Sequence, residues 1–265
     1  MSGPIDLSLW DLAAGAALIA VNGALSAWLG LGLGRRLLIA SLRTIVQLLI
    51  LGYALDFVFG LQHAWPVLAF GAAMIALAAR ESLQRSTRRW AGAGPAALLS
   101  LFVAAGGTVV LASAGIVGVE PWWEPRYLLP MLGMILGNSL TGISLGLDRC
   151  LAELDEGAPR VELALAFGAT RWEAARPVAA EALRTGMVPI LNSMAVVGLV
   201  TIPGMMTGQI LGGVPPALAA RYQILILFLI ASATAMGTAG AVLLSLRALF
   251  DDQHRLRRER ILRVE

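Results

Sequence analysis

The sequence predicts an all-α polytopic membrane protein, a bundle of about seven transmembrane helices that forms a single domain over residues 1–265. Its composition is 58% hydrophobic and 14% charged, with a mean hydropathy of +0.76, whereas soluble domains carry about 25% charged residues. Apolar runs recur along the whole chain, so no separate soluble domain of about 100 residues fits between them. Arginines gather between these runs rather than within them.

A transmembrane helix needs about 20 apolar residues. By that measure the sequence predicts spans at 9–32, 37–59, 64–80, 95–118, 126–147, 185–203 and 217–248. The first run is too long for a signal-peptide core and has no basic residue before it, so we expect it to be retained. The last run is long enough to tilt or to project from the membrane.

The basic residues predict the orientation. All 20 are arginine, and they cluster at 35–36, 80–89, 149–184 and 247–263, in alternate connections between the predicted spans. The positive-inside rule makes those connections cytoplasmic, with the N-terminus outside and the C-terminus inside a bacterial inner membrane. This function of the arginines also accounts for the pI of about 9.7 without a nucleic-acid partner.

One apolar stretch is interrupted by helix breakers. Residues 197–216 read VGLVTIPGMMTGQILGGVPP, and unpaired backbone groups facing lipid would cost several kcal/mol each. We therefore expect an outer hairpin over 203–216, re-entrant or not. Gln209 lies in this break, and Met205 and Met206 there could form a gate, act as soft ligands or simply pack.

The longest predicted cytoplasmic connection covers residues 148–184. Gly157 and Pro159 should end the helix that leaves the fifth span, and RVELALAFGAT should form a short amphipathic helix ending near Gly168. A new helix should begin at about Arg171. A short helix held between two membrane helices could transmit force from a partner, or it could lie on anionic lipid; the residues favour neither.

This segment also carries a family resemblance. VELALAFGATRWEAARP resembles the coupling loop of ABC transporter permeases, although Pro177 lies closer to the glycine than in the importer pattern. The strings PGMMTGQIL and RTIVQLLILGY are similar to FetB-type permeases, also called YbbM. That family is linked to bacterial iron export with a separate ATPase, and its plant relatives are linked to aluminium tolerance.

The resemblance implies the permease subunit of an ABC transporter, exporting iron or an iron complex. The chain has no G-x-x-x-x-G-K-[ST] phosphate loop, so a separate cytoplasmic ABC ATPase would hydrolyse ATP, in a complex of two permeases and two ATPases. The residues implied to contact that ATPase are Glu162, Ala164, Phe167, Gly168, Ala169 and Thr170.

Polar residues inside the predicted spans are candidates for a substrate pathway. Arg43 lies within the second span with Gln47 one turn later on the same face, although Arg43 could instead extend to the cytoplasmic surface. Isolated polar residues in a bundle also commonly bond a neighbouring helix. The candidate pathway comprises Arg43, Gln47, Asn138, Asn192, Met205, Met206 and Gln209.

Neither a resident metal, nor a cofactor, nor catalysis is predicted. Ferrous iron favours imidazole, carboxylate or thiolate ligands, but His63 and His254 lie outside the spans and Cys150 is the one cysteine. Exported iron would therefore be chelated, or would pass briefly through a polar pore. No H-E-x-x-H or G-x-S-x-G motif appears, so the chain is not predicted to be an enzyme.

Two other functions stay open. A secondary transporter would need an ion or proton site in the membrane, and the spans lack a central carboxylate. A non-transporting scaffold would recruit a cytoplasmic partner through residues 160–184. Only the ABC permease hypothesis requires that a partner's ATP hydrolysis respond to changes in that segment.

Overall fold

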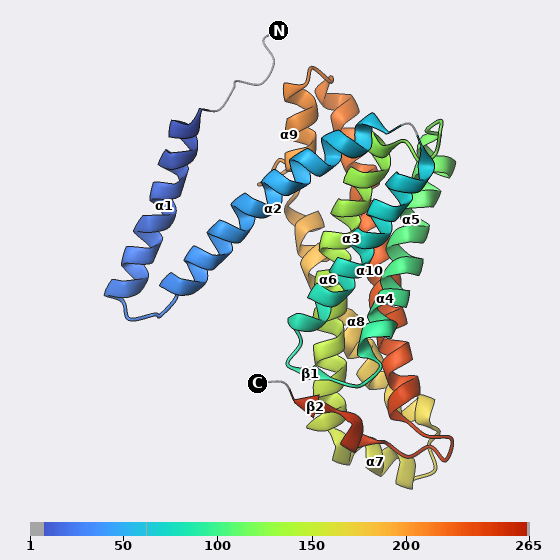
Figure 1. Ribbon diagram of the computed structural model, residues 1–265. Coiled ribbons are helices and arrows are strands. Elements are labelled where there is room, and N and C mark those ends of the chain that lie inside the picture. Colours follow the sequence, from blue (N-terminus) through green and yellow to red (C-terminus); the bar gives the residue numbers. More distant parts are fainter. Residues whose placement is uncertain (1–7, 62, 264–265) are drawn as a thin grey trace. The chain divides into compact units, whose positions relative to one another are not determined.

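The computed structural model describes residues 8–61 and 63–263, and it is almost entirely helical (Figure 1). The helices are α1 (Leu9–Trp28), α2 (Gly34–Gly60), α3 (Ala64–Gln84), α4 (Ala93–Leu101), α5 (Gly107–Val110), α6 (Pro125–Asp155), α7 (Ala158–Ala166), α8 (Arg171–Val196), α9 (Gly204–Leu211) and α10 (Pro216–Leu249). A π-helical segment, Phe102–Gly106, joins α4 to α5, and a second, Leu111–Val117, extends α5, so that residues 93–117 form one continuous helix. The predicted all-α class is confirmed.

The chain divides into two compact units. The first contains α1, α2 and residues 208–214, and the second contains residues 63–207 and 215–265. The boundary therefore falls inside α9. The prediction that residues 1–265 act as a single domain stays a prediction.

Most of the first unit is two apolar helices, α1 and α2, joined by a tight turn. Ser8 caps α1: its hydroxyl accepts a hydrogen bond from the Asp11 backbone N–H at 3.3 Å, and its own backbone N–H donates to the Asp11 carboxylate at 2.8 Å. Gly30 and Gly32 both have a φ of +65°, a left-handed conformation that costs glycine little. The turn to α2 depends on these two residues.

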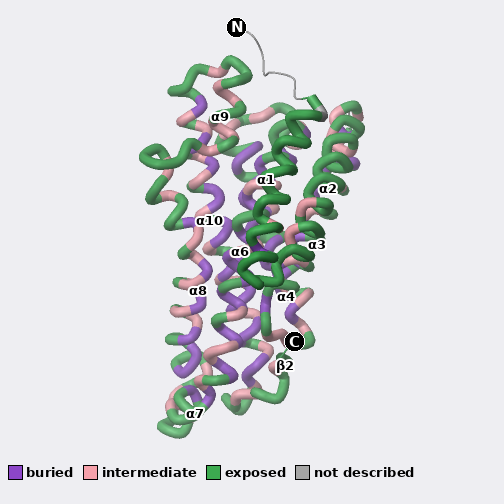
Figure 2. The backbone as a smooth tube through the Cα atoms, turned by 90° about the vertical axis from the view of Figure 1, so that its left-hand side faces the viewer, coloured by how far each residue is buried: buried purple, intermediate pink, exposed green. Residues whose placement is uncertain are grey.

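Six helical segments in the described residues are long and apolar enough to cross a membrane: α1, α2, α3, residues 93–117, α6 and α10. The predicted seventh span, at 185–203, does not qualify. Its helix, α8, starts earlier, at Arg171, ends at Val196 and carries several charged residues. It nevertheless runs beside α6 and α10 within the second unit (Figures 1 and 2). The predicted orientation of the termini stays a prediction.

The core of the second unit lies where α6, α8 and α10 cross, and Figure 2 shows buried residues concentrated along these helices. Glycines allow the crossing. A methyl group at Gly142 would lie 2.4 Å from Thr234 Cγ2 and 2.9 Å from the Gly186 carbonyl oxygen, closer than any real contact. One turn later along α6, Gly146 faces Thr238 in the same way. Small residues four apart thus bring three backbones together, as in many membrane bundles.

One end of the second unit, called the charged end below, holds a second apolar cluster. The fully buried Cys150 packs there with Val161 of α7, Ala175 of α8 and Leu249 of α10. A two-stranded antiparallel ladder lies at the same end: β1 (Arg88–Arg89) pairs with β2 (Leu262–Arg263). The chain after α10 therefore folds back against the rest of the unit.

Candidate functional site

Helix α7 forms at the position predicted for the short amphipathic helix. Gly157 precedes it, Pro159 lies in its first turn where a missing N–H costs nothing, and it ends at Ala166. Gly168 follows with a φ of +90°, and its N–H donates to the Leu165 carbonyl at 2.9 Å. A glycine in this left-handed conformation is a common helix C-terminus, so the chain can turn directly into α8.

Thr170 begins α8 with a reciprocal cap, which the sequence analysis did not identify. The Glu173 backbone N–H donates to the Thr170 hydroxyl oxygen at 3.4 Å, while the Thr170 N–H and hydroxyl both donate to the Glu173 carboxylate at 2.8 Å. The two hydrogen bonds that Thr170 donates, first from its backbone and then from its hydroxyl, lower the pKa of Glu173 below its usual range. The T-x-x-E spacing was the available signal, and α8 begins at Arg171 as predicted.

The two faces of α7 differ. Ala158 and Val161 are buried against the apolar cluster of the charged end. On the opposite face, Phe167 just beyond the helix is 84% exposed and Leu163 is 57% exposed. Of the predicted ATPase contacts, four are exposed and two are half-buried; the exposed ones are Glu162, Phe167, Gly168 and Thr170, and the half-buried ones are Ala164 and Ala169.

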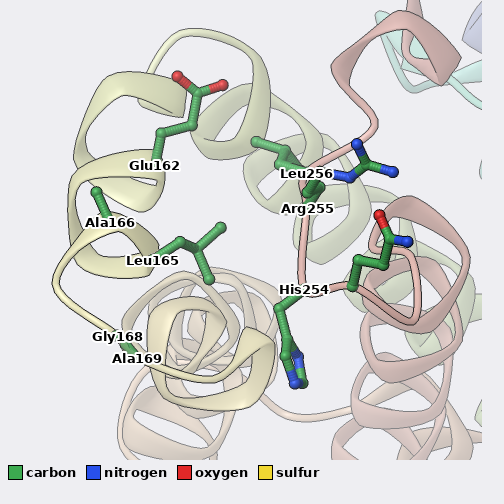
Figure 3. Close-up of a pocket in the computed structure, with 9 residues that line it drawn as sticks. Glu162, Leu165, Ala166, Gly168, Ala169, His254, Arg255 and Leu256 are labelled. Atoms are coloured by element: carbon green, nitrogen blue, oxygen red, sulfur yellow. The ribbon is translucent and has the colours of Figure 1, made fainter.

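A groove of about 630 Å³ separates α7 from the segment that follows α10 (Figure 3). Glu162, Leu165, Ala166, Gly168 and Ala169 line one wall. The opposite wall comprises residues 253–256, which the sequence analysis treated only as part of a basic tail. The Asp251 carboxylate accepts from the backbone N–H groups of Gln253 and Arg255 at 3.0 and 2.8 Å. This aspartate turn was the signal that could have predicted a structured wall.

The tail is fastened to both ends of the α7 segment. Asp155, the last residue of α6, is only 6% exposed and accepts from three arginines: Arg88 at 3.3 Å, Arg258 at 3.0 Å and Arg263 at 2.7 Å. We call this set the Asp155 clamp. Its members come from β1, from the end of α6 and from the C-terminal tail.

A second attachment joins the tail to the start of α8. The Arg171 backbone N–H donates to His254 Nδ1 at 3.2 Å, and the Arg171 guanidinium donates to the Asp251 carbonyl oxygen at 3.2 Å. Hydrogen bonds from the Arg255 backbone and side chain lower the pKa of Asp251. The two helices that flank α7 are therefore both tied to the same C-terminal segment.

A second hollow lies between the helices of the second unit, on the side of the crossing away from α7. It is partly open, because Asn138 and Ser193 in its wall are exposed, and it is called the interior hollow below. It measures about 440 Å³, and its walls come from α6, α8, α10, the start of α9 and the connection that precedes α9. Two predicted pathway residues, Asn138 and Met205, line it. Gln223 of α10 also lines it, although the sequence analysis did not identify this residue.

The other predicted pathway residues are not among those that line the interior hollow. Asn192 is exposed on α8 next to Ser193, which does line it, and Met206 follows Met205 in α9. Gln209 belongs to the part of α9 grouped with the first unit, and Arg43 and Gln47 lie on α2 of that unit. A role for these five residues in a pathway stays a prediction.

The described residues do not show the pattern of a metal-binding site. Within residues 8–61 and 63–263, no three histidine, cysteine, aspartate or glutamate side chains gather closely enough to hold a metal ion.

The outer hairpin predicted at 203–216 contains α9 and a turn in which Gly213 has a φ of +90°. Its place at the outer face of a membrane stays a prediction.

A family model covers almost the whole of this architecture. It is described as "Uncharacterised protein family (UPF0014)" and matches residues 9–250. The chain belongs to the UPF0014 family. That match includes all six apolar spans, α7 and the residues around the interior hollow, and it stops as the C-terminal tail begins.

Relatives of this UPF0014 chain come from bacteria and plants. The Synechocystis "UPF0014 membrane protein slr1647" is 36% identical over 95% of this chain and 97% of its own length. The Escherichia coli "Probable iron export permease protein FetB" is 30% identical over 81% of each chain. The Arabidopsis "Protein ALUMINUM SENSITIVE 3" is 30% identical over 81% of this chain and 77% of its own length. No solved structure matches.

These comparisons confirm the predicted family and a multi-pass membrane protein. They also show a relative named as a permease, a kind of protein that moves solutes and does not transform them.

Proposed function

We propose that this chain is the membrane subunit of an ABC transporter that exports iron or an iron complex, driven by ATP hydrolysis on a separate subunit. The charged end would face the cytoplasm, with the N-terminus outside. Two copies of the chain would assemble with two ATPases. The iron cargo is suggested by the name of the Escherichia coli relative.

The observation that supports the proposal best is the exposed apolar face of α7. Phe167 is 84% exposed and Leu163 is 57% exposed beside the groove of about 630 Å³. Aromatic side chains of this kind, beside a pocket, are typical anchors of protein interfaces. An ATPase could cover Phe167 and insert a side chain into the groove.

The attachments around α7 suggest how force would be transmitted. Because the Asp155 clamp holds the end of α6 and the His254 and Asp251 contacts hold the start of α8, a push on α7 would move both helices together. The same two helices line the interior hollow. Closure of the ATPases would then bias the bundle between two arrangements, provided that the ATPase binds them with different affinity.

Substitution of Phe167 tests this proposal. We expect Phe167→Ala to weaken co-purification with the cognate ATPase about tenfold or more, since loss of a central aromatic anchor commonly costs about 2 kcal/mol or more. ATP hydrolysis and ATP-dependent movement of ⁵⁵Fe in reconstituted vesicles should fall with it. Leu77→Ala, at another exposed leucine on α3, serves as the matched control.

The alternatives give different results. A scaffold would lose binding in Phe167→Ala without any change in hydrolysis per bound ATPase. A secondary transporter would move ⁵⁵Fe without the ATPase. If α7 only lies on lipid, Phe167→Ala would alter vesicle binding and leave the ATPase unaffected.

A further inference from the structure

The interior hollow has the size of a small-molecule site. Its volume of about 440 Å³ lies within the roughly 300–1,000 Å³ typical of such sites. Its walls come from three helices that cross at glycines, together with the start of α9. A solute there would touch α6 and α8, the two helices that flank α7.

An unpaired polar group lies in its wall. Gln223 is only 8% exposed, and its carboxamide oxygen is buried without a hydrogen-bond partner in the described structure. Buried polar atoms are nearly always paired, so each exception needs an explanation. A bound solute that donates an N–H or O–H to this oxygen would provide one.

Two other polar groups of the wall, Ser193 and Asn138, also offer acceptors. The Ser193 hydroxyl donates its single proton to the Pro189 carbonyl at 3.0 Å, so towards a solute its oxygen can only accept. The Asn138 amide nitrogen donates to the Met134 carbonyl at 2.9 Å, which leaves the amide oxygen for a ligand. Together with the unpaired Gln223 oxygen, the wall offers three acceptors to a solute that carries hydrogen-bond donors.

None of the residues that line the hollow is ionisable. A bare divalent cation that gave up part of its hydration there would gain no counter-charge, which is unfavourable. An uncharged complex avoids that cost, because the chelator neutralises the metal. The apolar wall residues, among them Ile190, Ile226 and Ile230, suit the hydrocarbon parts of such a complex.

We propose that the interior hollow is the cargo site, and that it takes iron as an uncharged chelate whose surface carries N–H or O–H donors. The choice of iron rests on the proposed function above. The neutral, acceptor-rich character of the site rests on Gln223, Ser193 and Asn138 themselves.

Equilibrium dialysis of the full chain in nanodiscs, without the ATPase, tests the proposal. The probes are the neutral tris(acetohydroxamato)iron(III) complex, which carries N–H donors, its N-methylated analogue, which lacks them, and Fe²⁺ alone under anaerobic conditions. Each is labelled with ⁵⁵Fe. We expect saturable binding of the first probe, binding of the analogue about tenfold weaker or more, and no saturable binding of Fe²⁺.

Variants of the chain distinguish binding at the interior hollow from non-specific uptake of the probe by the nanodisc. Gln223→Leu keeps the side-chain volume and removes the acceptor, so it should weaken binding of the first probe about tenfold and leave the weak binding of the N-methylated analogue unchanged. Gln84→Leu, at an exposed glutamine on α3, should bind like the wild type. If Gln223→Leu fails to fold, Ser193→Ala provides the second test, with a smaller loss expected.

Three outcomes would overturn the proposal. These are absence of saturable binding of the N–H-bearing complex, equal affinity in folded Gln223→Leu, and saturable Fe²⁺ binding that depends on Gln223. Because the assay contains no ATPase, its failure is distinct from failure of the coupling proposal, which Phe167→Ala tests.

Discussion

Helices α2 and α6 are both long and apolar, with 27 and 31 residues, yet they pack in opposite ways. More than half of the most apolar stretch of α6 is buried within the chain, whereas none of that of α2 is. Apolarity measures transfer into lipid and does not by itself bring helices together. The difference lies in what surrounds the glycines: Gly142 of α6 meets two other helices, while Gly52 of α2 has nothing within 4 Å.

The largest expected difference in stability comes from replacing one glycine by alanine in each of the two helices, Gly142 in α6 and Gly52 in α2. Gly142→Ala would place a carbon 2.4 Å from Thr234 Cγ2 and 2.9 Å from a backbone oxygen, which should cost about 3 kcal/mol as overpacking. Gly52→Ala should instead stabilise α2 by about 0.5–1 kcal/mol. Thermal unfolding of both variants in detergent measures the contrast. Equal melting temperatures would show that the crossing is looser than described.

A smaller effect is expected at the Asp155 clamp. Asp155→Asn removes the charge that three arginines share, and since Arg258 and Arg263 are more than half exposed, we expect a loss of about 1–3 kcal/mol, less than for a fully buried pair. Limited trypsin digestion should then cut the released tail faster. Asp56→Asn, at an exposed position near the end of α2, is the control, and equal digestion of both variants would exclude the clamp.

The smallest effect on stability is expected at Arg43. Arg43 is exposed on α2, so the Arg43→Leu variant should assemble normally. If Arg43 has a role in the substrate pathway or in an interface, ATP-dependent ⁵⁵Fe transport should nevertheless be lost. The measurement is vesicle transport alongside size-exclusion chromatography. Normal transport would favour the interpretation that Arg43 only reaches the membrane surface.

Much of the fold followed from local patterns. Apolar length predicted six of the spans, and Gly157, Pro159 and Gly168 predicted the limits of α7, because a helix ends where its own backbone is broken. Glycine spacing was less informative. Gly142 and Gly146 meet Thr238, but Gly137 has nothing within 4 Å, and Gly30 forms a turn.

The parts that the sequence did not predict depend on residues far apart in the chain. The Asp155 clamp joins positions 88, 155, 258 and 263, and no periodicity connects them. In the sequence, Gln223 is an ordinary polar residue near the start of a helix, and only the structure shows that it lines the interior hollow. The span predicted at 185–203 has other limits in the structure: α8 covers Arg171–Val196, and by length and composition it is not among the six apolar spans.

The enclosed position of Cys150 has a consequence for the protein's chemistry. It is the one sulfhydryl among 265 residues, and it is completely buried, where thiols react slowly. Peroxide would find no accessible thiolate at this position, and two copies could not be cross-linked through this side chain. A cysteine engineered on the surface, for example in place of Phe167, would be the single position that a maleimide dye or spin label reaches.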